Sequence, residues 1–440
     1  MSIQRRVVIT GLGVVSPLGC DLQTFWHLLS HGESGIGPIS EFDTSPFMSS
    51  LAGEVRDFDP TDFIPRKQAR RMGRVSQFAV ASSLMAVRHA GLNFDEENRM
   101  DTAVCYGTSV GGLKEAFEAH DSMLRKHYQH TNPFTMTSTF PNAVSAEVAI
   151  ALGVHGRCET YSIGCSSTAN AIGRAFDLIQ SSDVDIAIAG GAEAPLHPTI
   201  FSAMEAGRVL APDQGGSVRN LPRPFDRTRC GIVLGEGAGC IVLEEYEHAR
   251  RRGAVMYAEL EGWGFTCDAF SMARPSESGK EQRRVIDRAL SSAHWFPEEV
   301  DYVNACGLGT VELDLVETAA IKEALGNHAY RIPVSSFKSA LGHAFAASGA
   351  FQVIGTALAL EHQFIPPTLH LTSPDPDCDL DYVAMKGRPA HLRRALVNSF
   401  GFGGKNIVLA MSHVGEPVLQ ELPMENVWEG MVCDETVGAA

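Results

Sequence analysis

The chain has 440 residues, and its 36 Lys and Arg against 52 Asp and Glu give a formal charge of −16. A hydrophobic fraction of 44% with 20% charged residues is ordinary for a globular protein and excludes the disordered and fibrous classes. The acidic charge excludes generic nucleic-acid binding, which needs a basic surface. It still permits one acidic partner if basic residues are gathered in one place.

The cysteines and the start of the chain do not point to secretion. The apolar run after Arg6 is short, is broken by Gly11 and Gly13, and is followed by no acceptable signal-cleavage site. No stretch approaches the roughly 20 apolar residues that span a membrane. The ten cysteines are too sparse for a disulfide scaffold and form no CxxC pair. We therefore expect reduced thiols, a cytoplasmic location and no membrane partner.

Short β-branched runs alternate with helical stretches along the chain. Strands are predicted at 5–10, 102–108 and 183–191, and helices at 21–32 and 171–182. The later part of the chain repeats the alternation over residues 239–253, 255–265, 302–307, 332–338 and 395–404. This alternation indicates an α/β protein with buried sheets. It also suggests two similar halves that meet near residues 250–260, although identity alone does not establish a repeat.

The glycines at Gly11 and Gly13 follow the first predicted strand. They loosely resemble a dinucleotide-binding turn, but the third glycine is missing and Pro17 follows at once. A tight turn that packs against its own sheet is the better interpretation, so we expect no nucleotide cofactor.

Residues 161–170 predict a reactive thiol. A small-residue turn ends a strand at Cys165, and the run from Ala171 predicts a helix. A thiol at a helix N-terminus faces unpaired N–H groups and the positive end of the helix dipole, and both favour the nucleophilic thiolate. A backbone N–H at such a turn can bind a developing oxyanion. From this segment alone, a buried structural cysteine is an equally good interpretation.

Three further segments favour catalysis, because each is a strand end that carries polar or aromatic residues. They are 334–343 with Lys338 and His343, 398–406 with Phe400 and Phe402, and 304–310 with Cys306, followed by Asp314 and Glu317.

At this point the chain resembles a known family. The marks, in chain order, are VVITGLGVVSPLG, the turn at Cys165, DVDIAIAGGAE, RPFDRTRCGIVLGEGAG, SSFKSALGH and NSFGFGG. Over about residues 4–412 the chain is similar to β-ketoacyl-[acyl-carrier-protein] synthases of type II fatty-acid and polyketide pathways. Residues 317–336 and 366–383 are especially similar to aromatic polyketide ketosynthases. The resemblance implies the thiolase fold, with two fused α-β-α-β-α halves in five layers.

The resemblance also implies a role for each matching residue. Cys165 takes an acyl group from carrier-protein phosphopantetheine, and its backbone N–H forms an oxyanion hole with that of Phe402. His343 polarises the malonyl thioester carbonyl, and Lys338 orders the site electrostatically. Supporting and gating roles fall to Glu317, Asp314, Phe400 and Gly404, and contacts with pantetheine or the acyl chain to Thr310, Val110, Phe134 and Ala273. No cofactor or metal of its own is implied, since the carrier protein brings the phosphopantetheine.

One motif departs from the family pattern. The family's other catalytic histidine opens the motif N-A-H-G-T-x-T, and here that position is Cys306 while the first threonine is Leu308. At a further position where the family has a threonine that contacts pantetheine, this chain has Ala273. A thiol is a weak donor and cannot replace the two-sided hydrogen bonding of histidine. Because loss of one such donor costs about two to three orders of magnitude in rate, we expect Cys306→His to raise malonyl decarboxylation.

Four functions are open at this point. The preferred one is a ketosynthase that condenses with malonyl-carrier protein through Lys338 and His343. The second is an acyltransferase that passes the acyl group of Cys165 to an amine, alcohol or thiol. A non-catalytic subunit is disfavoured because Cys165 is retained. A zinc site made of Cys165, Cys306 and His343 is disfavoured because it lacks supporting residues.

The segment from Arg66 to Arg74 contains five cations in nine residues. The ordinary interpretation is a solvated helix face. By resemblance, the family places carrier-protein contacts at Lys67, Arg70, Arg71 and Arg208. Acyl carrier proteins are acidic, so a local basic patch can steer docking despite the overall negative charge.

The resemblance also divides the chain. We expect a first half over 1–255 with the nucleophile, a second half over 256–412, and an acidic extension over 413–440 that has six acidic residues and no Lys or Arg. The family usually forms dimers, so we expect a homodimer or a heterodimer with a chain-length-factor-like subunit.

Overall fold

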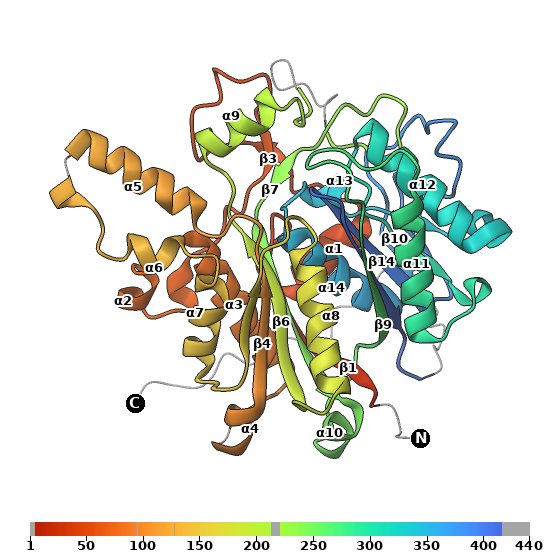
Figure 1. Cartoon of the computed structure of the whole chain (residues 1–440), viewed down its shortest axis with the longest axis horizontal. Coiled ribbons are helices and arrows are strands. Elements are labelled where there is room, and N and C mark those ends of the chain that lie inside the picture. Colours follow the sequence, from red (N-terminus) through yellow and green to blue (C-terminus); the bar gives the residue numbers. More distant parts are fainter. Residues whose placement is uncertain (1–4, 95, 127, 213–220, 416–440) are drawn as a thin grey trace.

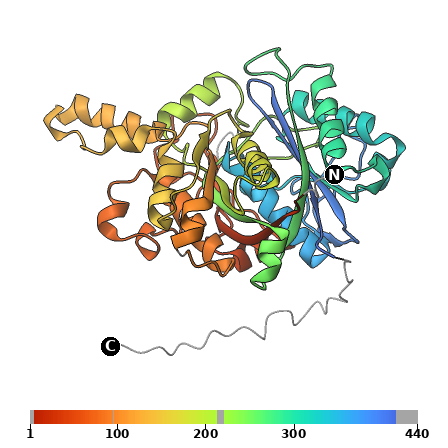
Figure 2. The same ribbon diagram turned by 60° about the horizontal axis from the view of Figure 1, so that its bottom comes forward.

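One continuous sheet of ten strands runs through the molecule (Figures 1 and 2). From the first part of the chain come β1 (Val7–Val15), β4 (Thr102–Gly107), β5 (Cys158–Tyr161), β6 (Ile186–Glu193) and β8 (Gly237–Glu245). From the second part come β9 (Ala258–Cys267), β10 (Tyr302–Asn304), β11 (Val334–Ser335), β14 (Arg394–Gly401) and β15 (Lys405–Ser412). This computed structural model describes residues 5–94, 96–126, 128–212 and 221–415.

The two sets of five strands have the same topology. The strand order is β5-β4-β6-β8-β1 in the first half and β11-β10-β14-β15-β9 in the second. In each half two parallel pairs are followed by two antiparallel pairs. The halves meet where β1 pairs antiparallel with β9. The duplication that the sequence only suggests is therefore plain in the strand order.

Helices form layers on both sides of the sheet and between its halves (Figure 1). Between them lie α8 (Ser167–Gln180) and α14 (Ala347–His362), which contact each other and strands of both halves. The outer faces carry α3 (Arg74–His89) and α7 (Ala143–Leu152) on the first half, and α11 (Lys280–Ala293) and α12 (Val311–Leu325) on the second. Fourteen of the sixteen residues of α14 are buried, as expected of a helix that is apolar or small on all sides.

The first predicted strand is longer than its sequence suggests. Residues 11–13, which we interpreted as a turn, continue β1 with a bulge before Gly11. A Cβ on Gly11 would lie 2.3 Å from the carbonyl oxygen of Ala86, and one on Gly13 would lie 2.1 Å from that of Ser82. The glycines are therefore needed because α3 packs directly on the strand backbone.

Shorter elements complete the fold. The helices are α1 (Leu22–His31), α2 (Arg66–Ala69), α4 (Glu96–Asp101), α5 (Leu113–Lys126), α6 (Thr135–Thr139), α9 (Pro198–Ala206), α10 (Tyr246–Arg251) and α13 (Lys338–Leu341). The small strands are β2 (Gly37–Pro38), β3 (Leu51–Gly53), β7 (Leu234–Gly235), β12 (Phe364–Ile365) and β13 (Arg388–Pro389). The 3-10 helices are η1 (Pro60–Asp62), η2 (Tyr128–His130), η4 (Pro297–Glu299) and η5 (Gly326–Arg331).

Helices α5 and α6 project from the body as an arm, at the left of Figure 1. Within the described part of the chain, no helix combines the length and the apolar character that crossing a membrane requires. The acidic extension predicted for 413–440 falls almost entirely on residues 416–440, outside the described residues.

Candidate active site

Cys165 lies in the turn between β5 and α8. The strand ends at Tyr161 and the helix begins at Ser167, so the predicted strand end at Cys165 and helix start at Ala171 are both displaced. The hydroxyl of Ser167 closes the turn by donating to the carbonyl of Gly164, at 2.6 Å. Gly164 has a φ of 81°, in the left-handed region that favours glycine.

A cavity of about 420 Å³ leads to this turn. Its lining includes the buried residues Cys165, His343 and Phe400, and also the exposed residues Arg208 and Arg274. Since the lining runs from buried to exposed side chains, the cavity connects the thiol with the surface. A long, thin substrate can therefore reach Cys165 from outside.

The environment of the thiol differs from the sequence-based expectation. Burial raises the pKa of Cys165 to about 11, although the backbone N–H of Phe402 and the cation of Lys338 act in the opposite direction. The sequence predicted that the positive end of α8 favours the thiolate, and burial of the sulfur acts in the opposite direction. Formation of the thiolate therefore depends on neighbouring hydrogen-bond donors.

His343 is the side chain that meets the thiol. Its Nε2 lies 3.2 Å from Sγ of Cys165, and its Nδ1 lies 3.2 Å from Oγ of Ser348. The Ser348 hydroxyl oxygen accepts the backbone N–H of Ala344. We therefore assign the Ser348 hydroxyl as the hydrogen-bond donor to Nδ1 of His343, which places the ring's own proton on Nε2. Burial, with a contribution from Lys338, lowers the pKa of His343 to about 3. The ring is therefore a neutral donor aimed at the sulfur.

Lys338 begins α13 and is 5% exposed. Its Nζ donates to the carbonyl of Cys306 at 2.8 Å and to Oε1 of Gln352 at 3.1 Å. The amide nitrogen of Gln352 in turn donates to the carbonyls of Ala305 and Asn398, each at 3.0 Å. Lys338 forms no ion pair with a carboxylate of the described residues, so its charge is balanced by dipoles.

Glu317 holds the backbone of the atypical motif. Its two carboxylate oxygens accept the N–H groups of Cys306 and Gly307, each at 2.8 Å, and one also accepts the amide of Asn398 at 3.0 Å. Burial raises the pKa of Glu317. The supporting contacts predicted for Glu317 are therefore made to the loop after β10.

Cys306 lies behind Phe400, whose side chain lines the cavity. Sγ of Cys306 lies 3.4 Å from the carbonyl oxygen of Phe400 and 3.5 Å from the nitrogen of the same residue. Cys306 is 2% exposed and is not among the residues that line the cavity. Burial raises the pKa of its thiol to about 12. In the described part of the chain no three His, Cys, Asp or Glu side chains are placed to hold a metal ion, so the zinc interpretation has no geometric support.

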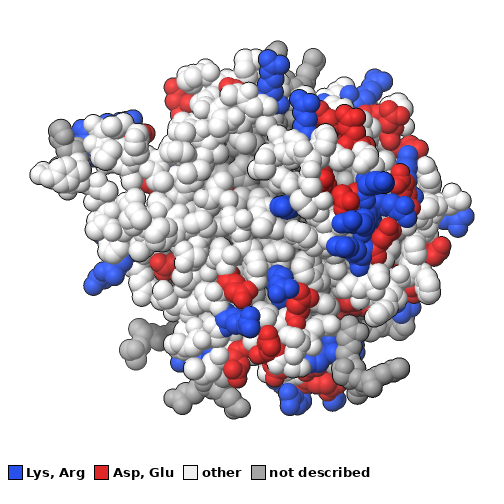
Figure 3. Space-filling model, viewed as in Figure 1, with Lys and Arg blue, Asp and Glu red and all other residues white. Residues whose placement is uncertain are grey.

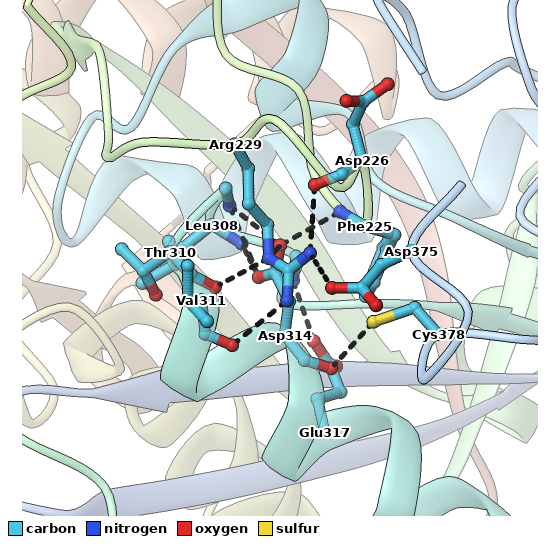
Figure 4. Close-up of polar contacts among 12 residues, drawn as sticks. Phe225, Asp226, Arg229, Leu308, Thr310, Val311, Asp314, Glu317, Asp375 and Cys378 are labelled. Atoms are coloured by element: carbon cyan, nitrogen blue, oxygen red, sulfur yellow. Dashed lines mark hydrogen bonds and ion pairs between the residues drawn. The ribbon is translucent and has the colours of Figure 1, made fainter. Parts of the chain in front are cut away.

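A buried ion cluster fixes the other end of this motif (Figure 4). Arg229 is 1% exposed in its side chain, donates to Asp375 at 2.6 Å, and lies 3.5 Å from the carboxylate of Asp314. Asp314 accepts the N–H groups of Leu308 and Gly309 at 3.0 and 3.2 Å. Burial raises the pKa of Asp314 to about 7, against the nearby Arg229. Asp314 thus orients the loop 306–310. The sequence motifs did not single out Arg229, whose guanidinium lies beside Asp314 in this cluster.

The loop after β14 passes directly over the nucleophile. Phe400 and Phe402 both line the cavity. A Cβ on Gly401 would lie 3.3 Å from Cβ of Cys165, so the backbone of the loop lies close against the thiol-bearing residue. Gly404, predicted to take part in gating, has a φ of 66° at the far end of the loop.

The residues predicted to contact pantetheine and the acyl chain divide into two groups. Thr310 and Ala273 line the cavity. Val110 and Phe134 do not. The N–H of Val110 is bound by the buried carboxylate of Glu193 at 3.1 Å. The ring of Phe134 lies 5.0 Å from the Arg71 guanidinium. Within one chain, neither position lines the cavity that leads to the thiol.

The cationic segment is smaller than its sequence suggests. Lys67, Arg70 and Arg71 are exposed on or just after α2. Arg74 turns inward and pairs with the buried Glu236 at 2.7 Å. Arg208 follows α9 at the rim of the cavity, and both views place α9 apart from α2 (Figures 1 and 2).

Comparison with known proteins decides the family. Residues 4–249 match the family model "Beta-ketoacyl synthase, N-terminal domain", and residues 257–372 match "Beta-ketoacyl synthase, C-terminal domain". The chain belongs to the β-ketoacyl synthase family. The resemblance that the motifs indicated is confirmed.

Relatives cover nearly the whole chain. It is 42% identical over 407 residues to 3-oxoacyl-[acyl-carrier-protein] synthase 2 of Synechocystis sp., covering 92% of this chain and 98% of the relative. It is 39% identical over 411 residues to the protein of the same name from Coxiella burnetii, covering 93% and 99%. The chain is therefore a ketoacyl synthase-type enzyme.

Solved structures confirm the thiolase fold. A complex described as a type II polyketide acyl-carrier protein with its ketosynthase bound to the hexaketide matches with a TM-score of 0.87 and 33% identity, covering 94% of this chain and 100% of that one. The ishigamide ketosynthase/chain length factor matches with a TM-score of 0.88 and 35% identity over the same shares.

Proposed function

We propose that this enzyme takes an acyl group from an acyl carrier protein onto Cys165 and extends it by decarboxylative condensation with a malonyl-carrier protein. The observation that carries the proposal is the 3.2 Å contact between the thiol of Cys165 and the neutral ring of His343. This pair lies on a cavity that reaches the surface beside Arg208.

In the acylation step the sulfur of Cys165 attacks the carrier-bound thioester carbonyl. The Sγ–acyl bond forms, the bond to the pantetheine sulfur breaks, and the proton of the Cys165 thiol passes to the departing pantetheine thiolate. The backbone N–H groups of Cys165 and Phe402 suit the oxyanion, because the second of these already faces the sulfur. The Nε2–H of His343 stabilises the thiolate as it forms.

In the condensation step the acyl group already occupies the sulfur. Loss of CO2 from the malonyl group leaves an electron pair on its α-carbon, which bonds to the acyl carbon while the sulfur departs. The Nε2–H of His343 donates to the thioester carbonyl on which enolate charge develops. Lys338 lies too deep for direct contact and acts through its field, since its Nζ is held by Cys306 and Gln352.

The alternative is an acyltransferase that passes the acyl group of Cys165 to an amine, alcohol or thiol. One observation favours this alternative. The sulfur of Cys306 is hydrogen-bonded to Phe400, so of the two side chains only His343 lines the cavity as a donor. We rank condensation first because the neutral tautomer of His343 suits a developing enolate.

Intact-mass measurement tests both functions. Incubation with an acyl-carrier protein should add the acyl mass to the wild-type chain, and addition of malonyl-carrier protein should release CO2 and yield a β-ketoacyl product. Acyl transfer to an added amine, alcohol or thiol without CO2 release would replace condensation by the alternative. Absence of acyl mass on Cys165 would contradict both.

For partners, we propose a second chain of ketosynthase type that covers the arm and the free edge of β5. The arm and α7 expose the apolar side chains Met123, Leu124, Tyr128, Met136, Phe140 and Ile150. In Figure 3, charged side chains are sparse over the left and middle of the same face. The residue of such a partner that corresponds to Phe134 would lie toward the thiol of Cys165. A partner of this type also matches the ketosynthase/chain length factor pair named for one structural neighbour. Cross-linking or mass photometry distinguishes a homodimer from a heterodimer.

A further inference from the structure

The sulfur of Cys306 is engaged at both of its hydrogen-bonding positions by one residue. The N–H of Phe400 donates to Sγ at 3.5 Å, and the thiol donates to the carbonyl of Phe400 at 3.4 Å. A thiol is one weak donor and one weak acceptor, and both of these hydrogen-bonding capacities are satisfied by Phe400.

The backbone of Cys306 is fixed independently of its side chain. Glu317 accepts its N–H at 2.8 Å, and Lys338 donates to its carbonyl at 2.8 Å. Both partners are buried. The sulfur therefore projects from a rigid base, and its contacts transmit that rigidity to Phe400 on the neighbouring strand β14.

The stems of the loop over the nucleophile are tied at a second place. The hydroxyl of Ser166, next to Cys165, lies 3.0 Å from the carbonyl oxygen of Ser399 and 2.9 Å from that of Lys405, and its single proton is shared between the two. Between these stems Gly403 and Gly404 both have positive φ, at 76° and 66°. The β14–β15 ladder pairs Phe400 with Asn406 and Gly401 with Lys405 at the base of the loop. Ser166 and Cys306 add side-chain contacts to this base.

We propose that Cys306 is a positioning residue that holds Phe400, and through it the loop 400–404, at the cavity wall. This inference rests on the proposed condensation for its kinetic consequence. By fixing the backbone of Phe400, the sulfur sets the place of the Phe400 ring in the cavity. The second substrate must pass that ring once Cys165 is acylated, so the contact governs the second half-reaction.

Direct action of Cys306 on the substrate fits the structure less well. The side chain is absent from the cavity lining, and both of its hydrogen-bonding capacities are already used by Phe400. The contact is also weak, which suits a loop that must be displaced and restored in each turnover.

The test compares Cys306→Ala, which removes both contacts, with Cys306→Ser, whose hydroxyl retains a donor and an acceptor. The control is Cys240→Ala, which deletes another buried thiol, in β8. Amide hydrogen exchange of the peptide covering 399–405 should rise about five- to tenfold in Cys306→Ala, as expected for loss of one hydrogen bond. Cys306→Ser should restore most of the protection, and Cys240→Ala should not change it.

The kinetic readout separates positioning from loss of stability. In Cys306→Ala we expect acylation of Cys165 to stay within about twofold, while the KM for malonyl-carrier protein rises about fivefold. Unchanged exchange at 399–405, no recovery in Cys306→Ser, or equal slowing of both half-reactions would overturn the inference. If the wild type yields no β-ketoacyl product but the exchange pattern holds, the proposed function fails and the positioning contact stands.

Discussion

The two halves of this chain share one strand order and divide one site between them. In the first half the turn before α8 carries Cys165, and in the second half the equivalent segment before α14 carries His343. These helices contact each other between the two halves of the sheet. The two equivalent segments therefore bring Nε2 of His343 within 3.2 Å of Sγ of Cys165, and we propose that one serves as the nucleophile and the other as the donor.

The halves differ most in what they add to the common core. The first half adds the arm of α5 and α6, which carries exposed apolar residues. The second half adds the loop 306–310 and the buried carboxylates Glu317 and Asp314 that hold it. The first half thus carries the thiol and the exposed apolar arm, while the second half carries the buried carboxylates that hold the loop beside the cavity.

The strongest test of this division is removal of the nucleophile. Cys165→Ala should abolish the acyl-enzyme and lower turnover by about a thousandfold or more, because no other described thiol contacts His343. Intact mass after incubation with acyl-carrier protein measures the acyl group directly. Acyl mass persisting at the wild-type level would assign the nucleophile to another residue.

Removal of the donor from the second half should be more selective. His343→Ala should lower CO2 release from malonyl-carrier protein by about a hundredfold or more, whereas acylation of Cys165 should fall less. Radiolabelled CO2 and intact mass measure the two half-reactions separately. Equal losses in both would show that His343 serves the thiol and not the malonyl carbonyl.

The surface of the first half is tested through Arg70 and Arg71. Replacing both with Glu should lower kcat/KM for an acyl-carrier protein about tenfold and leave a small thioester substrate nearly unaffected. The effect should shrink as ionic strength rises. Arg88→Glu, an exposed arginine near the far end of α3, is the matched control. Similar loss with both substrates would argue against docking.

The electrostatics of the second half should appear as a pH dependence of stability. The pKa of Asp314 is raised to about 7 in the fold from an ordinary value of 3.8. The folded state therefore retains a proton that the unfolded chain loses, so this group's contribution to stability falls as pH rises from about 4 to 7. The expected slope is about −1 kcal/mol per pH unit.

Urea unfolding of wild type and Asp314→Asn at pH 5 and pH 7 measures this slope. The variant should be less stable at both pH values, because an amide cannot accept every N–H that the carboxylate accepts, and its slope should be shallower. If Asp314→Asn keeps the wild-type dependence of unfolding free energy on pH, that dependence comes from another buried acid.

Part of the site was predictable because the chemistry lies in short contiguous motifs. Cys165, Lys338 and Phe402 lie within a few residues of the ends of β5, β11 and β14, whereas His343 follows α13. Connections that follow strands of one sheet can meet at the same edge of that sheet. The α/β class followed from the alternation of strands and helices. The alternation only suggested two halves, and the two-half thiolase architecture was implied by the resemblance of the motifs. Boundaries were less accurate, as at the strand end near Cys165, since the Ser167 hydroxyl and Gly164 close the turn through tertiary detail.

Other features depend on contacts between distant segments. The pairing of Cys306 with Phe400 joins residues 94 positions apart, and Arg229 reaches Asp375 across 146 positions. The Gln352 amide donates to the carbonyls of Ala305, just after β10, and Asn398, in β14. No short sequence motif predicts these contacts. The raised pKa of Cys165 depends on its burial by side chains from distant segments, which the local helix-terminus pattern does not show.

The seam between the halves has a consequence for how the molecule unfolds. Strands β1 and β9 pair from Val7↔Leu260 to Ile9↔Ala258, and Arg6 adds a two-pronged bond to Glu259 with one arm at 2.8 Å. The largest apolar cluster draws side chains from both halves. Because separation would leave a strand edge and a core face open to water, the halves should melt in a single cooperative transition. Neither half should survive as an independent folding unit.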